Sequence, residues 1–95
     1  MDEFETELMA AVGAKIAAAR EAAGMSQQAL GSATGVSKVF ISNLENGLTK
    51  ANLAHIVRIA DALNVHPAAL LPEPKMTPEV AASFLAMGGE LVKKR

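Results

Sequence analysis

Cysteine, tryptophan and tyrosine are absent from the 95-residue sequence, whose only aromatic residues are three phenylalanines. Without cysteine the chain has no disulfide and no thiolate metal site, which fits a reducing compartment. The two histidines, His55 and His66, are far apart and have no clustered acids beside them, so we expect no metal and no cofactor. A nucleophile beside a base, a glycine-rich phosphate loop and paired carboxylates are also missing, so we expect no enzyme.

Long apolar runs are missing as well. No stretch approaches the roughly 18 residues of a membrane span, and the acidic start of the chain is the opposite of a basic signal peptide. We therefore expect a cytoplasmic protein with no membrane contact. A chain of this length has room for one domain and a small appendage.

Positive charge is scarce for a nucleic-acid-binding protein, because the net charge is −1. The positions of the charges along the chain matter more than their sum. Four acids lie within the first seven residues, whereas lysine and arginine outnumber the acids in the rest of the chain. Acids at this position suit the positive end of a helix dipole. The alternative is an acidic arm that contacts a partner protein.

The stretch from residue 26 to residue 47 predicts two short helices joined by a tight turn. Ser26 is a good N-cap for a first helix that runs to about Thr34. Gly35 can take the positive φ that ends a helix, and Ser37 caps the second helix. Gly31, in the middle of the first helix, indicates a close helix crossing, although any helical hairpin can also use a small packing residue there.

The second helix has an apolar side and a side free to contact a partner. Val36, Ile41 and Leu44 recur at helical spacing and should face the core. Lys38, Val39, Ser42 and Asn43 should face outward. Two helices joined in this way, with polar residues on the outer side of the second, are typical of a helix-turn-helix that reads DNA.

Apolar residues at helical spacing predict further helices on both sides of this motif. The first covers residues 4–23, the fourth residues 52–64 and a short fifth residues 66–71, where Pro67 suits the first turn. The first stripe consists of Phe4, Leu8, Val12, Ile16, Ala19 and Ala23, and the fourth-helix stripe of Leu53, Ile56, Val57, Ala60 and Leu63. The sequence therefore predicts an all-α fold, with a five-helix domain in residues 1–71.

Residues beyond this domain predict a linker and one more helix. Prolines make residues 72–76 a stiff connector, and Thr77 and Pro78 open a C-terminal amphipathic helix over residues 77–95. Its apolar stripe consists of Val80, Phe84, Met87 and Leu91. Such a stripe is more apolar surface than one free helix should expose, so we expect it to form a homodimer. The alternative is that it folds back onto its own chain.

Residues 12 to 71 resemble the lambda-repressor-like helix-turn-helix family of the Cro/repressor, XRE type. The matching residues are Gln27, Leu30, Gly31, Gly35-Val36-Ser37, Ile41-Ser42 and Leu44-Glu45-Asn46-Gly47. The resemblance implies a five-helix DNA-binding domain whose second motif helix enters the major groove. It does not extend to the two ends of the chain.

The resemblance also implies a role for individual residues. Lys38, Val39, Ser42 and Asn43 would face base edges, and Gln27, Ser37, Asn46, Thr49 and Lys50 would contact phosphates. The chemistry is consistent, because lysine can donate to guanine, asparagine can pair with adenine and valine can touch a thymine methyl. Val39 departs from the polar residue that many phage repressors carry, which leaves the base preference there open.

By the same resemblance, Arg20 pairs with Glu45 and fixes the second motif helix. The alternative is two unrelated surface charges. The function expected first is a sequence-specific transcriptional repressor that binds a palindromic operator in double-stranded DNA as a homodimer. A second is an antitoxin-type protein that grips a protein partner and regulates its own synthesis. A third is an interaction module that has lost DNA binding.

Overall fold

Helix α1 (Glu3–Ala22) begins at a capping box. In this computed structural model, which describes residues 1–73 and 78–86, the Glu5 backbone N–H donates to the Asp2 carboxylate at 2.8 Å. The Asp2 N–H donates to the Glu5 carboxylate at 3.0 Å. Two amides that the helix leaves free at its start are thereby satisfied. Some of the N-terminal acids therefore stabilise the start of α1, as the helix dipole predicts.

The helix-turn-helix consists of α2 (Gln27–Thr34) and α3 (Lys38–Glu45). Its predicted caps are confirmed. The hydroxyls of Ser26 and Ser37 each accept the backbone N–H three residues on, at 3.0 Å. Gly35 ends α2 with a φ of 77°, a left-handed conformation that a side chain would disfavour. The turn is thus specified by local chemistry.

Helix α4 (Leu53–Leu63) begins at the predicted cap Asn52, whose side chain accepts the His55 N–H at 2.8 Å. The predicted fifth α-helix is wrong, because residues 67–70 form a single 3-10 turn, η1 (Pro67–Leu70). Pro72 follows so closely that Leu71 is already extended, with φ −107° and ψ 151°. Too few residues remain for an α-helix, so four α-helices and η1 build the bundle in residues 1–73, where no strand occurs.

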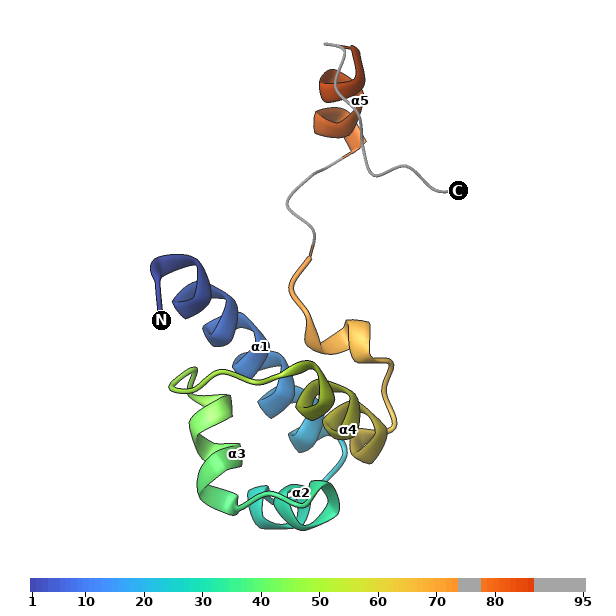
Figure 1. Ribbon diagram of the computed structural model, residues 1–95. Helices are drawn as coiled ribbons and strands as arrows, with labels where there is room; N and C mark the ends of the chain where they lie inside the picture. The colour runs from blue at the N-terminus through green and yellow to red at the C-terminus, as the bar shows by residue number, and fades with distance from the viewer. Residues whose placement is uncertain (74–77, 87–95) are drawn as a thin grey trace.

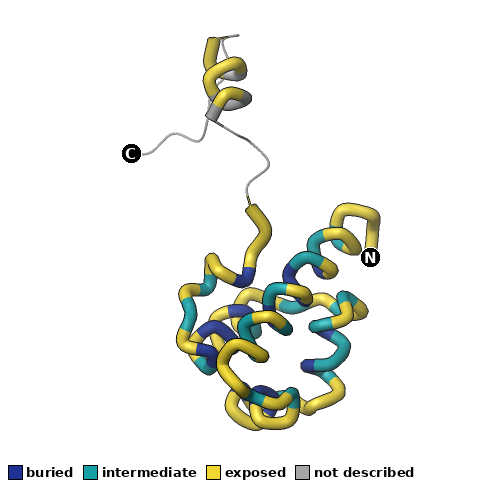
Figure 2. Tube along the Cα trace, turned by 180° about the vertical axis from the view of Figure 1, so that it is seen from behind, coloured by how far each residue is buried: buried dark blue, intermediate teal, exposed yellow. Residues whose placement is uncertain are grey.

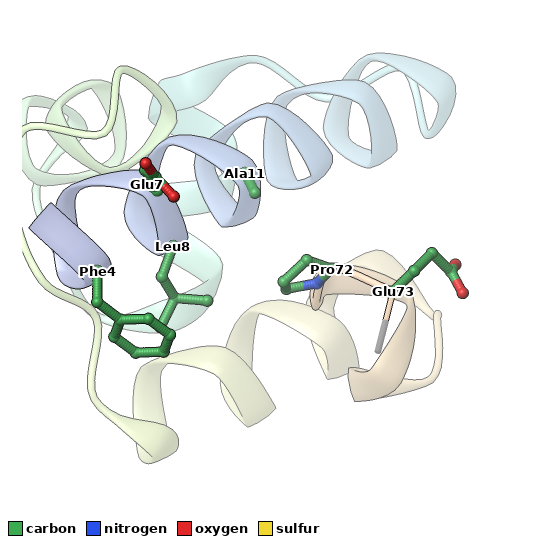
Figure 3. Close-up of a pocket in the computed structure, with 6 residues that line it drawn as sticks. All are labelled: Phe4, Glu7, Leu8, Ala11, Pro72 and Glu73. Carbon is green, nitrogen blue, oxygen red and sulfur yellow. The ribbon is translucent and has the colours of Figure 1, made fainter. Parts of the chain in front are cut away.

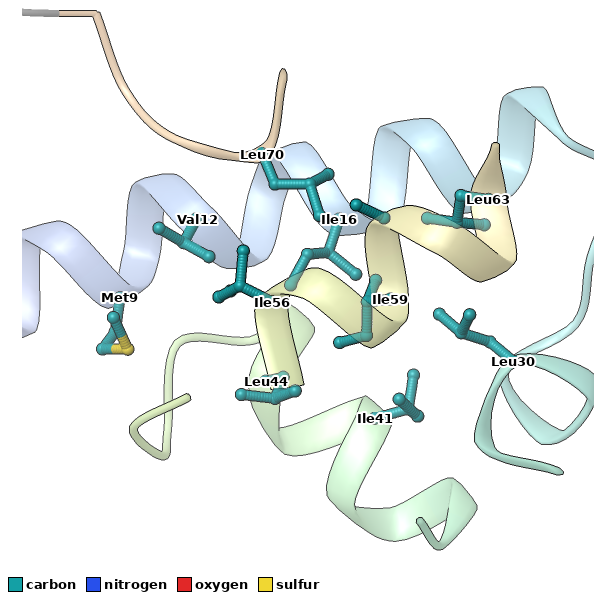
Figure 4. Close-up of a cluster of buried hydrophobic side chains, with 11 residues drawn as sticks. Met9, Val12, Ile16, Leu30, Ile41, Leu44, Ile56, Ile59, Leu63 and Leu70 are labelled. Atoms are coloured by element: carbon teal, nitrogen blue, oxygen red, sulfur yellow. The ribbon is translucent and has the colours of Figure 1, made fainter. Parts of the chain in front are cut away.

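The bundle encloses one apolar core (Figures 1 and 2). Helix α3 packs against α1 and α2, and α4 packs against α1, α2 and η1. All five elements contribute buried side chains, which meet in Figure 4. The core consists of Met9, Val12, Ile16, Leu30, Ile41, Leu44, Ile56, Ile59, Ala60, Leu63 and Leu70.

Two of the predicted stripes are shifted in register. Phe4 is 67% exposed and Leu53 78% exposed, whereas Met9 and Ile59, which the stripes omitted, are buried. Val57, which the stripe included, is also exposed. Phe4 and Leu53 lie in the first turns of α1 and α4. Helical spacing predicts that a face is apolar but not where the partner helix ends.

Helix α5 (Pro78–Ala86) covers nine of the residues predicted as a C-terminal helix. Met87 and Leu91 of its predicted stripe lie outside the described residues. In Figure 1, α5 lies apart from the bundle. No helix in the described parts of the chain is both long enough and apolar enough to cross a membrane.

Candidate nucleic-acid interface

The turn between α2 and α3 brings the two helices into backbone contact. The Val36 N–H donates to the Gly31 carbonyl at 2.9 Å. A Cβ added at Gly31 would lie 2.7 Å from the Val36 carbonyl oxygen, closer than side chains allow. Gly31 is therefore required by the close approach of α2 to the start of α3, as predicted. This contact orients α3 relative to α2.

Helix α3 turns one side to the core and the other to solvent. Ile41 and Leu44 are buried, and Val36, just before α3, packs against the core. Lys38 is exposed and Val39 is 68% exposed, whereas Ser42 and Asn43 are half-buried. The four residues predicted to face base edges thus lie on the side of α3 that the core leaves open. Their contacts with DNA remain predictions.

A cluster of hydrogen bonds fixes the C-terminal end of α3. Arg20 of α1 donates to the Glu45 carboxylate through Nε at 2.6 Å and through a terminal nitrogen at 3.1 Å. The two side chains are 13% and 6% exposed, so this bidentate pair is largely buried. A further Arg20 nitrogen donates to the Met25 carbonyl at 2.8 Å. The hydrogen bond to Glu45 raises the pKa of Arg20, whose guanidinium is charged in any case.

Gln27 belongs to the same cluster. Its Nε2 donates to Glu45 Oε1 at 2.9 Å, so Glu45 receives donors from both α1 and α2. The cluster ties these helices to α3, which fixes the angle at which α3 projects. The sequence predicted Gln27 only as a phosphate contact. Its side chain also donates a hydrogen bond to Glu45 within the protein. Its contact with phosphate remains a prediction.

Three of the residues predicted to contact phosphates lie close to α3 in the sequence. Ser37 precedes the helix, and Asn46 and Thr49 follow it. The Ser37 hydroxyl oxygen accepts the Phe40 N–H, which leaves its own hydrogen free to donate. Asn46 caps the end of α3 and is exposed, and Thr49 is half-buried in the following loop. Hydroxyl and amide groups at such positions can donate to phosphate oxygens.

Lys50, the remaining predicted phosphate contact, is already ion-paired. Its Nζ lies 3.0 Å from Glu5 Oε2, in an exposed pair between the loop after α3 and the first turn of α1. The Lys50 ammonium, followed by the Asp2 backbone N–H, lowers the pKa of Glu5. Nothing in the sequence indicates this pair, because its members are 45 residues apart.

Gly13 is a second residue that the sequence did not single out. A Cβ there would lie 2.8 Å from the Glu45 carbonyl oxygen and still closer to that of Leu44. Helix α1 therefore crosses the end of α3 with backbone against backbone. The available signal was a glycine in the middle of a long helix, where it costs about 1 kcal/mol relative to alanine.

The arrangement presents a short helix with exposed Lys38 and Val39, held from behind by buried hydrogen bonds. Such a helix can enter a DNA major groove while the flanking donors meet the backbone. Among residues 1–73 and 78–86, no group of three or more histidines or acids could hold a metal ion.

Two short helices joined across a glycine turn, with the second held outward on a helical bundle, define a helix-turn-helix protein. A family model described as Helix-turn-helix, HTH_3, matches residues 16–70. The match spans more than half of the chain, and the protein belongs to this family. Proteins with this domain include regulators of transcription that bind DNA.

Solved structures with the same fold include regulators and one enzyme. The restriction-modification controller protein C.AhdI from Aeromonas hydrophila is 27% identical, with 66% of this chain and 96% of that chain covered and a TM-score of 0.64. The c2 repressor of P22, solved in complex with a synthetic operator, is 37% identical, with 63% and 91% covered and a TM-score of 0.60.

Hydroxypropylphosphonic acid epoxidase from S. wedmorenis is also similar, at 27% identity and a TM-score of 0.65. The likeness covers 68% of this chain but only 35% of the enzyme. It therefore concerns a minor part of the epoxidase chain. The comparison with curated protein sequences finds no match.

Proposed function

We propose that the protein is a sequence-specific transcriptional repressor that binds a near-palindromic operator as a homodimer. The observation that carries the proposal is the exposed side of α3, with Lys38 and Val39 in solvent and the helix end fixed by Glu45. Its likeness to the P22 c2 repressor, which was solved with operator DNA, supports the same mode of binding.

In this proposal α3 lies in the major groove. Lys38 donates to guanine, Asn43 pairs with adenine and Val39 contacts a thymine methyl, with Ser42 beside them. The phosphate contacts come from Gln27, Ser37, Asn46, Thr49 and Lys50. One short helix reads only a few base pairs, so two copies on half-sites about one helical turn apart are needed for high affinity.

Selection of binding sites from randomised duplex DNA tests the proposal and identifies the operator. The expected result is a two-fold symmetric site. Enrichment of no sequence at low salt would overturn it and would favour a protein-interaction module.

The roles of Asn43 and Lys50 are then separated by substitution. Asn43→Ala should relax preference at one base pair and lose about 1–3 kcal/mol of discrimination there. Lys50→Ala should weaken binding to every sequence about equally and flatten the slope of log affinity against log salt by roughly one unit. Titrations of matched and mismatched duplexes over a salt series measure both. Equal loss of specificity in the two variants would contradict these roles.

A further inference from the structure

A groove lies between the first half of α1 and the segment that follows η1 (Figure 3). Its volume is about 320 Å³, and it is lined by Phe4, Glu7, Leu8, Ala11, Pro72 and Glu73. The walls are mostly apolar, with one carboxylate from each side. Phe4 is 67% exposed here. Covering such an aromatic ring would remove a large apolar area from water.

Every residue that lines this groove lies outside the family match of residues 16–70. The part of α1 before the match forms one wall, and the chain just after the match forms the other. Leu8 packs against the core at the base of the groove, whereas Phe4 at its rim is exposed. The groove is built where the two parts of the chain outside the family match come together.

The segment that best fits the groove is the C-terminal one, residues 78–95. Its sequence carries the apolar residues Val80, Phe84, Met87 and Leu91 at helical spacing and ends in Lys93, Lys94 and Arg95. The N-cap and first turns of α1 carry four acids, Asp2, Glu3, Glu5 and Glu7. A helix antiparallel to α1 would place its apolar stripe along the groove and its basic end beside these acids. The two surfaces are thus complementary in both polarity and charge.

The course of the chain favours an exchange between two copies. Leu71 is extended, and Pro74 favours extended backbone at Glu73 as well. The backbone that leaves the edge of the groove is therefore extended. Only residues 74–77 separate Glu73 from Pro78, the first residue of α5. Helix α5 lies apart from the bundle that precedes it (Figure 1). A two-fold exchange would fill both grooves with equivalent contacts.

We propose that the groove binds the C-terminal segment of a second copy of this chain, antiparallel to α1. This inference rests on the homodimer in the proposed function and names its interface. Each copy supplies one groove and one segment.

The first test is Phe4→Ala in the full chain, with the dimer dissociation constant measured by sedimentation without DNA. Phe4 is exposed and outside the core, so the variant should fold. Loss of this anchor should raise the dissociation constant about tenfold or more. Leu48→Ala is the matched control, because Leu48 is 68% exposed but does not line the groove. It should dimerise like the original chain.

The second test separates exchange from folding back. The chain has no cysteine, so engineered thiols are its only thiols. One preparation carries Glu7→Cys in the groove and another carries Leu85→Cys beside the stripe. Mixed and treated with a short bis-maleimide, they should form a crosslinked dimer that contains one copy of each.

The outcomes are distinct. A crosslinked monomer from the Glu7→Cys, Leu85→Cys double variant, with no product from the mixture, would overturn the exchange. If Phe4→Ala dimerises normally while removal of residues 77–95 abolishes the dimer, the groove is not the interface, although the homodimer in the proposed function stands. A monomeric full chain would overturn both the groove and the homodimer, whereas selection of operator DNA would still test DNA binding separately.

Discussion

Single charged residues set how α3 is held and how strongly its surroundings attract DNA. The Arg20–Glu45 pair is largely buried, so its carboxylate depends on the donors that Arg20 and Gln27 supply. The Glu5–Lys50 pair is exposed and weak by comparison. The first pair holds α3 in place. The second pair engages Lys50, which we propose as a contact to the DNA phosphates.

The Arg20–Glu45 pair should behave as one energetic unit. Arg20→Ala strands the Glu45 carboxylate in the interior, so we expect a loss of about 3–5 kcal/mol in the free energy of unfolding. Glu45→Ala should also destabilise, and the double variant should cost less than the sum. Gln27→Ala, which leaves the ion pair intact, should cost less than either. Urea unfolding of the variants measures the coupling, and a value below about 0.5 kcal/mol would refute it.

Glu5 should compete with DNA for Lys50. Its pKa is lowered, so the pair stabilises the folded chain above the ordinary carboxyl pKa and is lost only as the pH falls through the lowered value. At neutral pH the carboxylate is therefore charged and holds Lys50. Glu5→Gln keeps a capping-box side chain but removes the charge, so operator affinity should rise about twofold to fivefold.

Glu3→Gln is the control for this prediction. It removes the same charge from the same turn of α1, but Glu3 forms no ion pair within the described residues. Its effect on operator affinity should be smaller. Equal gains from the two variants would show that long-range charge, and not release of Lys50, explains the result.

Close backbone contacts, together with apolar packing, position the helices in this bundle. Gly31 permits the contact of α2 with the start of α3, and Gly13 permits that of α1 with the end of α3. The direction of α3 therefore depends on two missing side chains, one at each end. A displaced α3 would misalign the residues that we propose to read DNA.

Gly13→Ala should destabilise the fold although alanine favours helices. The added methyl meets backbone carbonyls of α3, so α1 and α3 must separate, at a cost of about 1–3 kcal/mol. Gly35→Ala is the comparison, because its cost of about 1 kcal/mol comes only from a positive φ, with no atom near the new methyl. Thermal unfolding compares them, and operator binding should fall more for Gly13→Ala. A Gly13→Ala variant as stable as the original would contradict the backbone contact.

The whole molecule combines a helical bundle in residues 1–73 with a C-terminal segment. Among the residues whose burial the structure describes, the core extends from Met9 to Leu70 and includes none from the C-terminal segment. DNA reading and dimer formation can therefore be separated by truncation. The proposed dimer depends on the end of the chain, and the fold of the bundle does not.

Removal of residues 77–95 should leave a folded, mostly monomeric domain with much weaker operator binding. The retained residues include the entire described core, and loss of the second half-site removes much of the affinity. Circular dichroism, sedimentation and operator titration measure the three properties. If the truncated chain still sediments as a dimer, the interface lies elsewhere.

Local sequence signals are sufficient to predict the helix-turn-helix and several helix ends. Ser26, Gly35, Ser37 and Asn52 act through their own backbone or a neighbour three residues away, so the sequence alone predicts the helix-turn-helix and its boundaries. The Arg20–Glu45 pair was predictable only through resemblance to a family. No rule of spacing connects residues 25 positions apart.

Tertiary structure alone decided the remaining features. It exposed Phe4 and Leu53, buried Met9 and Ile59, and joined Glu5 to Lys50. It also required glycine at position 13. Each of these depends on where one helix ends against another and how closely their backbones approach. Helical periodicity specifies which side of a helix is apolar, whereas crossing points and helix ends arise only when all the elements pack together.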